Sequence, residues 1–212
     1  MTPVMCLVTD RQRLGGADRL VERVSWAVRA GVHLVQVRER DLEGRALTAL
    51  VAGCVAAVRG TRTRIVVNDR VDVAVAAGAH GVHLRADSMA AARVRTMVAP
   101  GFLVGRSVHG LDEARDADAA GGLDYLLYGT VFASTSKPGR APTGTSALAA
   151  VAAAVRVPVL AVGGVTPDNL EEVAATGASG FAAIGMFAAA SETALVQAAA
   201  RAAAAWTTRR ID

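Results

Sequence analysis

Eight short apolar runs recur along the chain at intervals of about 26 residues, and the segments between them carry charges at helical spacing. Each run is β-branched or otherwise apolar and lacks the alternation of a strand with one exposed face. Such runs are typical of strands buried on both faces, as in a parallel sheet. The expected strands are residues 4–8, 33–37, 65–67, 81–84, 102–104, 125–128, 159–162 and 181–184.

Eight repeats of strand and helix in 212 residues predict a single (β/α)8 TIM-barrel domain that spans residues 1–212. This length is close to the lower limit of about 200 residues for the fold. The alternative is a doubly wound open sheet, which usually has fewer strands and a glycine-rich turn after the first one. The stretch VTDRQRLGG after the first apolar run contains no GxGxxG pattern, so the barrel is favoured.

The charge distribution favours a small anionic ligand over a macromolecular partner. The net charge is +4 and the pI is about 9.8, but the 23 basic residues are spread along the chain without a polybasic run. Nucleic acid is therefore not an expected partner. No stretch approaches the roughly 18 apolar residues of a membrane span. We expect a cytoplasmic protein with Cys6 and Cys54 as buried free thiols. The oligomeric state stays open, with a homo-oligomer as one alternative.

Polar side chains gather where the expected strands end, which is where a barrel enzyme has its active site. Any one of these groups has an ordinary explanation, such as a salt-bridged strand end or a helix cap. Their recurrence at several strand ends favours one common site. The residues placed in this way are Gln36, Arg38, Arg40, Asn68, Asp69, Arg70, His83, Arg85, Asp87, Arg106, Ser107 and His109.

Glycines after the last two expected strands indicate a phosphate site. Gly163, Gly164 and Gly185 allow backbone N–H groups to approach a ligand closely, and barrels often bind phosphate at these two loops. Thr166 and Pro167 follow directly and are typical of a helix start. The expected helix would direct its positive end toward the same place.

The loop over residues 130–145 is rich in Ser, Thr, Gly and Pro and is longer than an ordinary connection. It is expected to be either a mobile lid that brings Lys137 over the pocket or a plain surface loop. His109 lies next to Ser107 just after the fifth strand, and histidine can exchange a proton near neutral pH. No cluster has zinc spacing, and no serine nucleophile motif is present.

Six stretches of the sequence together resemble the thiamine-phosphate synthase superfamily, in unbroken order from about residue 33 to residue 187. They are VQVRERD, VVNDRVDVAVAAGAHGVHL, GRSVH, DYLLYGTVFASTSK, AVGGVTPDN and GASGFAAIGMF. The resemblance implies one of two activities. The synthase branch joins a pyrimidine diphosphate to a thiazole phosphate with magnesium. The tautomerase branch converts a dihydro-thiazole carboxylate phosphate to its aromatic form without a metal.

Under this resemblance Arg38 and Arg40 take the positions of synthase residues that hold diphosphate, and Gln36 and Asn68 also match. The magnesium ligands do not all match. Asp69 fits one ligand, but Ser88 stands where the synthase pattern has the second acid, and Asp87 is one residue away. The loop after the sixth strand keeps Lys137 but lacks the proline of the synthase pattern. Gly185 stands where a synthase usually has serine.

We therefore expect a thiazole tautomerase in which His109 moves the proton and no metal takes part. The substrate would be a small-molecule thiazole phosphate, with its phosphate on the glycines and its carboxylate on Arg38 or Arg106. The alternative is the synthase, which would use Asp69 with Asp87 as a shifted Mg²⁺ pair and the arginines and Lys137 on diphosphate. A third interpretation is a non-catalytic ligand sensor on the same barrel. The substrate-binding set is Gln36, Arg38, Arg40, Asn68, Arg106, Ser107 and Lys137.

Overall fold

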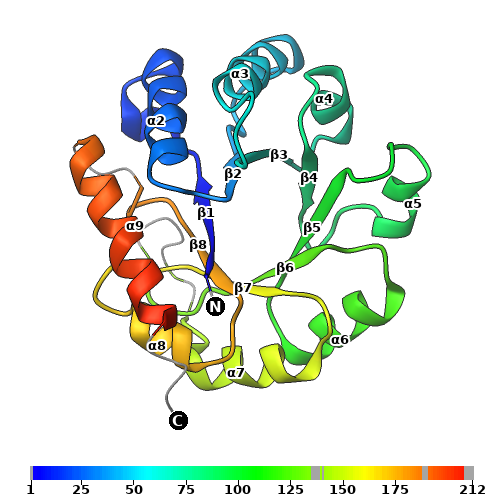
Figure 1. Cartoon of the computed structure of the whole chain (residues 1–212). Coiled ribbons are helices and arrows are strands. Elements are labelled where there is room, and N and C mark those ends of the chain that lie inside the picture. The colour runs from blue at the N-terminus through cyan, green and yellow to red at the C-terminus, as the bar shows by residue number, and fades with distance from the viewer. Residues whose placement is uncertain (1, 135–138, 140, 188–190, 208–212) are drawn as a thin grey trace.

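The chain folds into a closed barrel of eight parallel strands that pair in sequence order, and the last strand pairs with the first. Figure 1 shows the helices arranged as a ring outside the strands. The computed structural model describes residues 2–134, 139, 141–187 and 191–207. The (β/α)8 TIM-barrel prediction is confirmed. The strands are β1 Val4–Val8, β2 Leu34–Val37, β3 Arg64–Asn68, β4 Gly81–Leu84, β5 Leu103–Val108, β6 Tyr125–Tyr128, β7 Val159–Val162 and β8 Gly180–Ala183.

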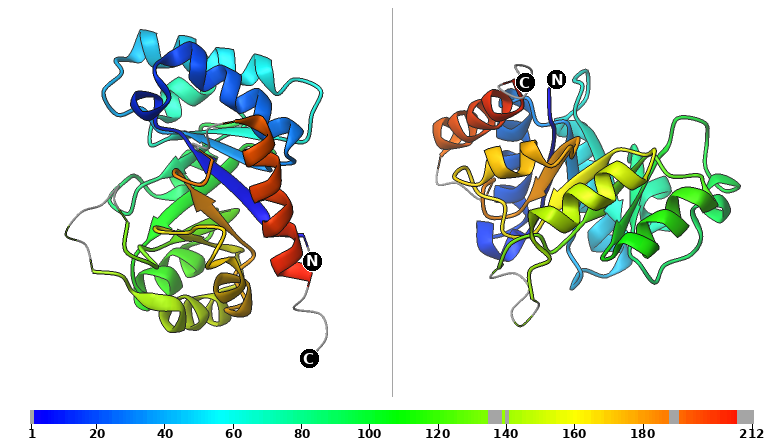
Figure 2. Two further views of the ribbon diagram at one scale, coloured as in Figure 1. Left: turned by 90° about the vertical axis from the view of Figure 1, so that its left-hand side faces the viewer. Right: turned by 90° about the horizontal axis from the view of Figure 1, so that it is seen from below.

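The helices cover the outside of the barrel with apolar stripes. In α2 the buried residues are Leu20, Val24 and Ala27, spaced by four and three positions, which places them on one face. The last helix, α9, packs against both α2 and α8 and completes the ring (Figure 2). None of the described helices is long and apolar enough to cross a membrane. The helices are α1 Arg11–Leu14, α2 Ala17–Arg29, α3 Gly44–Ala57, α4 Val71–Ala76, α5 Ala91–Arg95, α6 Leu111–Ala120, α7 Gly144–Ala154, α8 Leu170–Ala175 and α9 Glu192–Thr207.

The barrel interior is a packed core, so a ligand can bind only at one of its ends. A second, larger apolar layer lies between the strands and the helices. Cys6 belongs to the inner layer and Cys54 to the outer one, and both are free thiols. Burial raises the pKa of each thiol to about 12, which keeps both protonated. The buried residues of the inner cluster are Cys6, Val8, Leu34, Val66, Tyr125, Leu127, Leu160 and Ala182.

The fifth strand differs most from the sequence-based expectation. The apolar run predicted a strand over residues 102–104, whereas β5 extends over Leu103–Val108. Arg106 and Ser107 therefore lie within the strand, and Ser107 aligns with Leu127 on β6. The extension was missed because polar side chains interrupt the apolar pattern at a strand end that faces the site.

The closure between β1 and β8 requires a residue without a side chain at Gly180. A Cβ atom built at Gly180 would lie 2.0 Å from the carbonyl oxygen of Val4, which is backbone and cannot move aside cheaply. Gly180→Ala is therefore expected to lower the free energy of unfolding by about 2–3 kcal/mol, the range of an overpacked core site. The shift of the urea midpoint at an unchanged m value measures this loss.

A matched control is Gly53→Ala in α3, where the new Cβ would lie 3.5 Å from Val21 Cγ2, an ordinary contact. Alanine is a better helix former than glycine by up to about 1 kcal/mol, so this variant is expected to be as stable as the parent or more stable. Equal urea midpoints for the Gly180→Ala variant and the parent would contradict the tight contact between Gly180 on β8 and Val4 on β1.

Candidate active site

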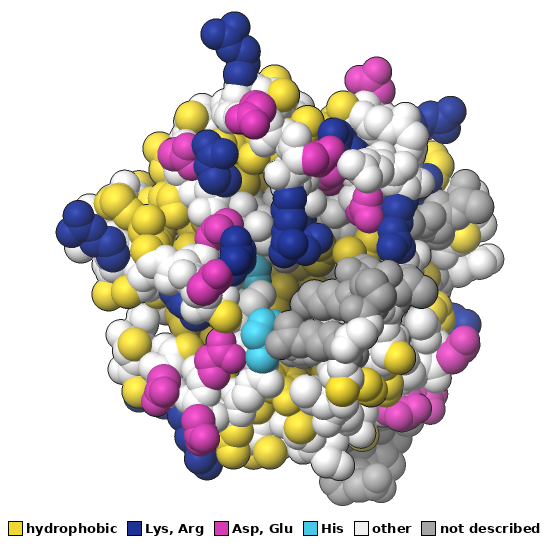
Figure 3. Space-filling model, turned by 180° about the vertical axis from the view of Figure 1, so that it is seen from behind, with side chains coloured by type: hydrophobic (Ala, Val, Ile, Leu, Met, Phe, Trp, Pro, Cys, Tyr) yellow, Lys and Arg dark blue, Asp and Glu magenta, His cyan; other side chains and the backbone are white. Residues whose placement is uncertain are grey.

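A cavity of about 710 Å³ opens at the end of the barrel where the strands finish. Its walls come from residues at or just after the carboxyl ends of the strands, as expected for a barrel enzyme. The volume lies in the range of about 300–1,000 Å³ that is typical of small-molecule sites. Figure 3 shows this end of the molecule, with a central hollow, Lys and Arg side chains along one rim and histidine along another.

Four arginine side chains line the cavity, namely Arg13, Arg38, Arg40 and Arg85. Burial, followed by the nearby charge of Arg40, lowers the pKa of Arg38. The structure shows no salt bridge between either of these two residues and the rest of the described chain. A partly buried cation beside a second cation is stabilised when an anion binds it, so this wall is suited to a phosphate-type ligand.

A buried carboxylate holds the arginine-bearing end of β2 in place. Glu39 accepts a hydrogen bond from Thr9 Oγ1 at 2.5 Å, and its two oxygens share the backbone N–H of Arg11, each at 3.1 Å. The Thr9 hydroxyl in turn accepts from the backbone N–H of Arg38 at 3.0 Å. The residue between the two arginines therefore points away from the cavity and anchors them to the end of β1. The sequence alone did not indicate this role for Glu39, which lies between the two arginines of the VRER stretch.

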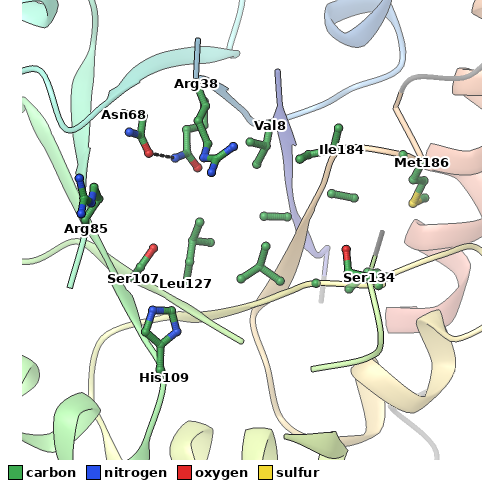
Figure 4. Close-up of a pocket in the computed structure, with 18 of the residues that line it drawn as sticks. Val8, Arg38, Asn68, Arg85, Ser107, His109, Leu127, Ser134, Ile184 and Met186 are labelled. Carbon is green, nitrogen blue, oxygen red and sulfur yellow. Dashed lines mark hydrogen bonds between the residues drawn. The ribbon is translucent and has the colours of Figure 1, made fainter. Parts of the chain in front are cut away.

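Two amide side chains lie beside the arginine wall. Gln36 donates from Nε2 to Asn68 Oδ1 at 3.1 Å (Figure 4). The Oε1 atom of Gln36 is buried and has no hydrogen-bond partner in the described part of the chain. A buried carbonyl oxygen without a donor is costly, and Gln36 lines the cavity. A ligand that brings an N–H group to this atom would satisfy it.

The opposite wall is built from the glycine-rich turns after β7 and β8. Gly163 and Gly164 have φ values of 98° and 66°, which side chains rarely adopt. Both residues line the cavity, as does Gly185. Arg85 follows β4 and Gly185 follows β8, which are four strands apart in the closed barrel, so these two residues lie on opposite sides of the cavity. Figure 4 shows Arg38 and Arg85 away from Met186, which follows β8.

The expected helix start at Thr166 is wrong. The turn continues to Asn169, and α8 begins at Leu170. Asn169 closes this turn, since its Oδ1 accepts from the Thr166 N–H and its Nδ2 donates to the Gly164 carbonyl, both at 2.9 Å. A phosphate bound at this wall would therefore contact the glycine backbone and not a helix terminus.

Ser107 and His109 lie next to each other on a third side of the cavity (Figure 4). His109 Nδ1 lies 2.6 Å from the carbonyl oxygen of Gly129, which can only accept, so Nδ1 carries the hydrogen. The backbone N–H of His109 donates to Glu113 Oε2 at 2.7 Å. These bonds fix the ring and leave Nε2 as the nitrogen that can accept or return a proton.

Sequence comparison assigns the family. Residues 5–187 match the profile of the family described as thiamine monophosphate synthase. The chain belongs to that family. The match begins before the residues that carried the resemblance, so it also includes the first strand and the first two helices.

Individual members of the thiamine monophosphate synthase family are similar over most of their length. A protein of Geobacter sulfurreducens named putative thiamine-phosphate synthase is 41% identical over 179 residues, which cover 84% of this chain and 83% of that protein. A thiamine-phosphate synthase of Solidesulfovibrio magneticus is 45% identical over 158 residues, 74% of each chain. The solved structure of the thiamine phosphate pyrophosphorylase from Pyrococcus furiosus superposes with a TM-score of 0.82 at 30% identity, covering 96% of this chain and 95% of that one.

These comparisons place the chain in a family of thiamine-biosynthesis enzymes and change the balance between its two branches. The relatives named above carry the name of the synthase or of a pyrophosphorylase, and none carries the name of a tautomerase. The expectation of a tautomerase rested on the missing second acid and on His109. The names of the relatives favour the branch that was the alternative.

The magnesium that the family implies needs acidic ligands at the ends of β3 and β4, and the residues present do not fit it well. Asp69 accepts a short hydrogen bond from the Ser88 hydroxyl, so a hydroxyl stands where a second carboxylate is needed. Asp87 instead pairs with Arg85 Nη2 at 2.6 Å. Arg85 Nη1 also lies 3.8 Å from Asp69, which brings a cation to this position. Within the described residues no group of three His, Cys, Asp or Glu side chains could hold a metal ion.

Arg106 does not line the cavity, in contrast to the expectation that it faces the substrate. Its guanidinium donates to the carbonyl oxygens of Ala86 at 2.9 Å and Arg85 at 3.2 Å, and also to that of Met89. These bonds hold the loop after β4 in place. Since β5 is longer than predicted, Arg106 alternates with Ser107 along the strand and points to the other side.

The remaining candidates are placed as follows. Lys137 lies outside the described residues, as do residues 135, 136, 138 and 140 of the segment that was expected to form a lid. Arg13 was missed as a candidate for the cavity wall, whereas Arg85, placed at the end of the fourth expected strand, does line the cavity, although no role was assigned to it. Arg85 follows His83 by two positions at the end of β4, and this spacing along the strand was the available signal. Arg13 lies in α1, a short helix that the apolar pattern did not predict.

The glycine wall provides a test of phosphate binding. A Cβ atom at Gly163 would lie 2.5 Å from Thr130 Cγ2 and the residue has a positive φ, so Gly163→Ala must displace the turn. We expect the KM for a phosphate-bearing substrate to rise about tenfold or more, the effect of losing one or two hydrogen bonds to a charged group. Gly53→Ala in α3 is the control, because Gly53 does not line the cavity and its new Cβ would make only an ordinary contact. Equal KM values for the two variants would contradict the role of the Gly163 turn.

Proposed function

We propose that the chain couples a pyrimidine diphosphate to a thiazole phosphate, the reaction after which its relatives are named. The observation that carries the proposal is that arginine side chains and glycine turns, two kinds of group suited to anions, line the same cavity. Arginines at the ends of β2 and β4 line one wall, and the glycine turns after β7 and β8 form the other. Such a cavity suits two phosphate-bearing substrates bound at the same time.

The charge of the arginine wall supports a diphosphate ligand. A single carboxylate is satisfied by one guanidinium, whereas Arg38 and Arg40 both line this cavity without a salt bridge to the rest of the described chain. Arg13 and Arg85 line it as well, paired with Asp10 and Asp87. A diphosphate carries several negative charges and offers oxygens for more than one bidentate contact. Coupling breaks the bond between the pyrimidine-bearing carbon and the diphosphate, forms a bond from that carbon to the thiazole, and releases pyrophosphate. The arginines would stabilise the charge that develops on the leaving group.

Opposed walls would also position the reacting atoms. The glycine turns would hold the phosphate of the thiazole, and the arginines would hold the diphosphate, so that the two rings meet between them. Fixing two reactants in one geometry removes much of the entropic cost of a bimolecular step. The proposed partners are therefore these two small molecules. Because the residues at Asp69 fit magnesium poorly, no step is assigned to a metal.

Release of pyrophosphate with both substrates present tests this function. We expect pyrophosphate and the coupled product in equal amounts, and neither when one substrate is omitted. Omission of each substrate in turn separates coupling from simple hydrolysis of the diphosphate. Pyrophosphate without coupled product, or no turnover in either the presence or the absence of magnesium, would contradict the proposal.

The tautomerase remains a second candidate because a specific observation favours it. His109 presents Nε2 at the cavity wall while its Nδ1 is bound to the Gly129 carbonyl. An imidazole held in this way is suited to remove a proton from a bound ring and to return it to another carbon. Replacement of the second acid by Ser88 is also compatible with a reaction that uses no metal.

A further inference from the structure

Three side chains form a buried hydrogen-bonded chain that ends at the cavity. Tyr125 OH lies 3.2 Å from His83 Nδ1, and His83 Nε2 lies 2.9 Å from Ser107 Oγ. Tyr125 is 5% exposed and His83 is 1% exposed, whereas Ser107 lines the cavity. The proposed reaction uses neither Tyr125 nor His83, although both are polar groups buried in the barrel core.

A glycine makes this chain sterically possible. Gly105 on β5 aligns with His83 on β4 and with Tyr125 on β6, so the three residues form one row across the barrel. A Cβ atom at Gly105 would lie 2.1 Å from Tyr125 Cζ. Without a side chain there, the tyrosine ring passes over β5 and stacks against the imidazole at a centroid distance of 5.6 Å. The glycine of the GRSVH stretch thus allows the contact that its serine completes.

The buried hydroxyl of Tyr125 determines where the hydrogens of this chain lie. A tyrosine hydroxyl has one hydrogen to donate, and His83 Nδ1 is its one hydrogen-bond partner within the described residues. Burial raises the pKa of Tyr125 well above 10, so the hydroxyl keeps its hydrogen. Leaving a buried donor without an acceptor costs about 1–3 kcal/mol. The favoured arrangement is therefore Tyr125 O–H donating to Nδ1, which places the ring hydrogen on Nε2.

The same reasoning extends to Ser107. With the hydrogen on His83 Nε2, the ring donates to Ser107 Oγ, and the serine hydrogen is no longer directed at the imidazole. We infer that Tyr125 and His83 are positioning residues that orient the Ser107 hydroxyl as a donor toward the cavity. The substrate atom at this wall would then be a hydrogen-bond acceptor without a hydrogen of its own, such as a phosphate oxygen or an aromatic ring nitrogen.

The tautomer of His83 can be measured without any substrate. We expect ¹⁵N-NMR of the ligand-free protein to show His83 protonated on Nε2, with the signal assigned by its loss in the His83→Asn variant. Tyr125→Phe removes the donor to Nδ1, so the ring hydrogen should then be shared between the two nitrogens. Tyr128→Phe is the matched control, because Tyr128 lies on the same strand in the outer apolar layer. Protonation on Nδ1 in the parent, or the same tautomer in the Tyr125→Phe variant, would overturn the inference.

A double-mutant cycle tests whether Tyr125 acts through Ser107. This kinetic part rests on the proposed function, whereas the NMR measurement does not, so the two can fail separately. Ser107→Ala is expected to lower kcat/KM about 10- to 100-fold, and Tyr125→Phe about three- to tenfold, as for lost hydrogen bonds to a charged and a neutral group. In the Ser107→Ala background Tyr125→Phe should cause no further loss. Multiplicative effects of the two substitutions would show that Tyr125 has a merely structural role and would overturn the inference.

Discussion

Replacing Arg38 with alanine is expected to lower kcat/KM for the coupling reaction by about 10²–10³-fold, the effect of losing one preorganised group that stabilises developing charge. Arg38 lines the cavity, its neighbour Arg40 carries a like charge, and burial already disfavours its charged form. A bound diphosphate would compensate this cost. The alanine variant leaves the second arginine and the Glu39 anchor in place, so the loss should appear in kinetics and not in stability.

Two further variants make the Arg38 prediction specific. Arg38→Lys keeps the charge but loses the planar fork of donors, and we expect a loss of about tenfold. Arg115→Ala removes the same charge from an exposed position on α6, where the side chain lies 3.7 Å from Asp112, and should leave kcat/KM unchanged. If Arg38→Ala kept more than about a third of the parent activity, the arginine wall would not bind the leaving group.

Replacing His109 with glutamine is expected to separate the two candidate reactions. Any aromatisation of a dihydro-thiazole carboxylate phosphate should fall by about 10²–10⁴-fold, the usual contribution of a general base. Coupling needs no proton transfer at this position and should stay within about threefold of the parent, the scale of one lost hydrogen bond. Glutamine can still donate to the Gly129 carbonyl as Nδ1 does, so the fold around β6 is preserved.

The initial rates of both reactions, measured on the parent and on the His109→Gln variant, check this separation. Thermal unfolding of the two proteins provides the control for a structural effect. A loss of coupling as large as the loss of aromatisation would mean that His109 acts in both reactions or holds the cavity together. In either case the assignment of roles along β5 would have to change.

Much of the architecture could be predicted from the sequence because buried parallel strands have a simple apolar pattern. The runs at residues 4–8, 81–84, 125–128 and 159–162 coincide with β1, β4, β6 and β7. The pattern fails where a strand enters the site. β5 continues through Arg106 and Ser107, whose polar side chains were taken as the sign of a strand end. Backbone pairing with the neighbouring strands keeps Arg106 and Ser107 in the barrel. An apolar pattern along the sequence contains no information about this pairing.

The site could be predicted in outline and less well in detail. Gln36, Arg38, Ser107 and His109 all line the cavity, since residues on alternate positions at a strand end share a face. Arg106 does not, because it contacts carbonyl groups of the next loop that lie far from it in sequence. For the same reason, the hydrogen bonds of Glu39 and the Tyr125–His83–Ser107 chain could not be predicted from the sequence. These contacts join different strands and depend on the barrel register.

The close approach of the Tyr125 ring to Gly105 shows why a sequence pattern does not predict such contacts. A glycine in a strand usually indicates a bulge or a close approach, but the partner of that approach is not encoded nearby. Here the partner is a ring 20 positions later on the next strand. The short stretch GRSVH therefore combines a steric requirement, a loop anchor and two cavity residues within five positions.

Turnover with two substrate sets on one preparation of the protein distinguishes the synthase from the tautomerase. One set contains the pyrimidine diphosphate and the thiazole phosphate, the other contains the dihydro-thiazole carboxylate phosphate, and each is measured with magnesium and with a chelator. We expect coupled product and pyrophosphate from the first set, at a rate well above any aromatisation of the second. Aromatisation alone, unaffected by the chelator, would contradict it and would establish the tautomerase with His109 as its base.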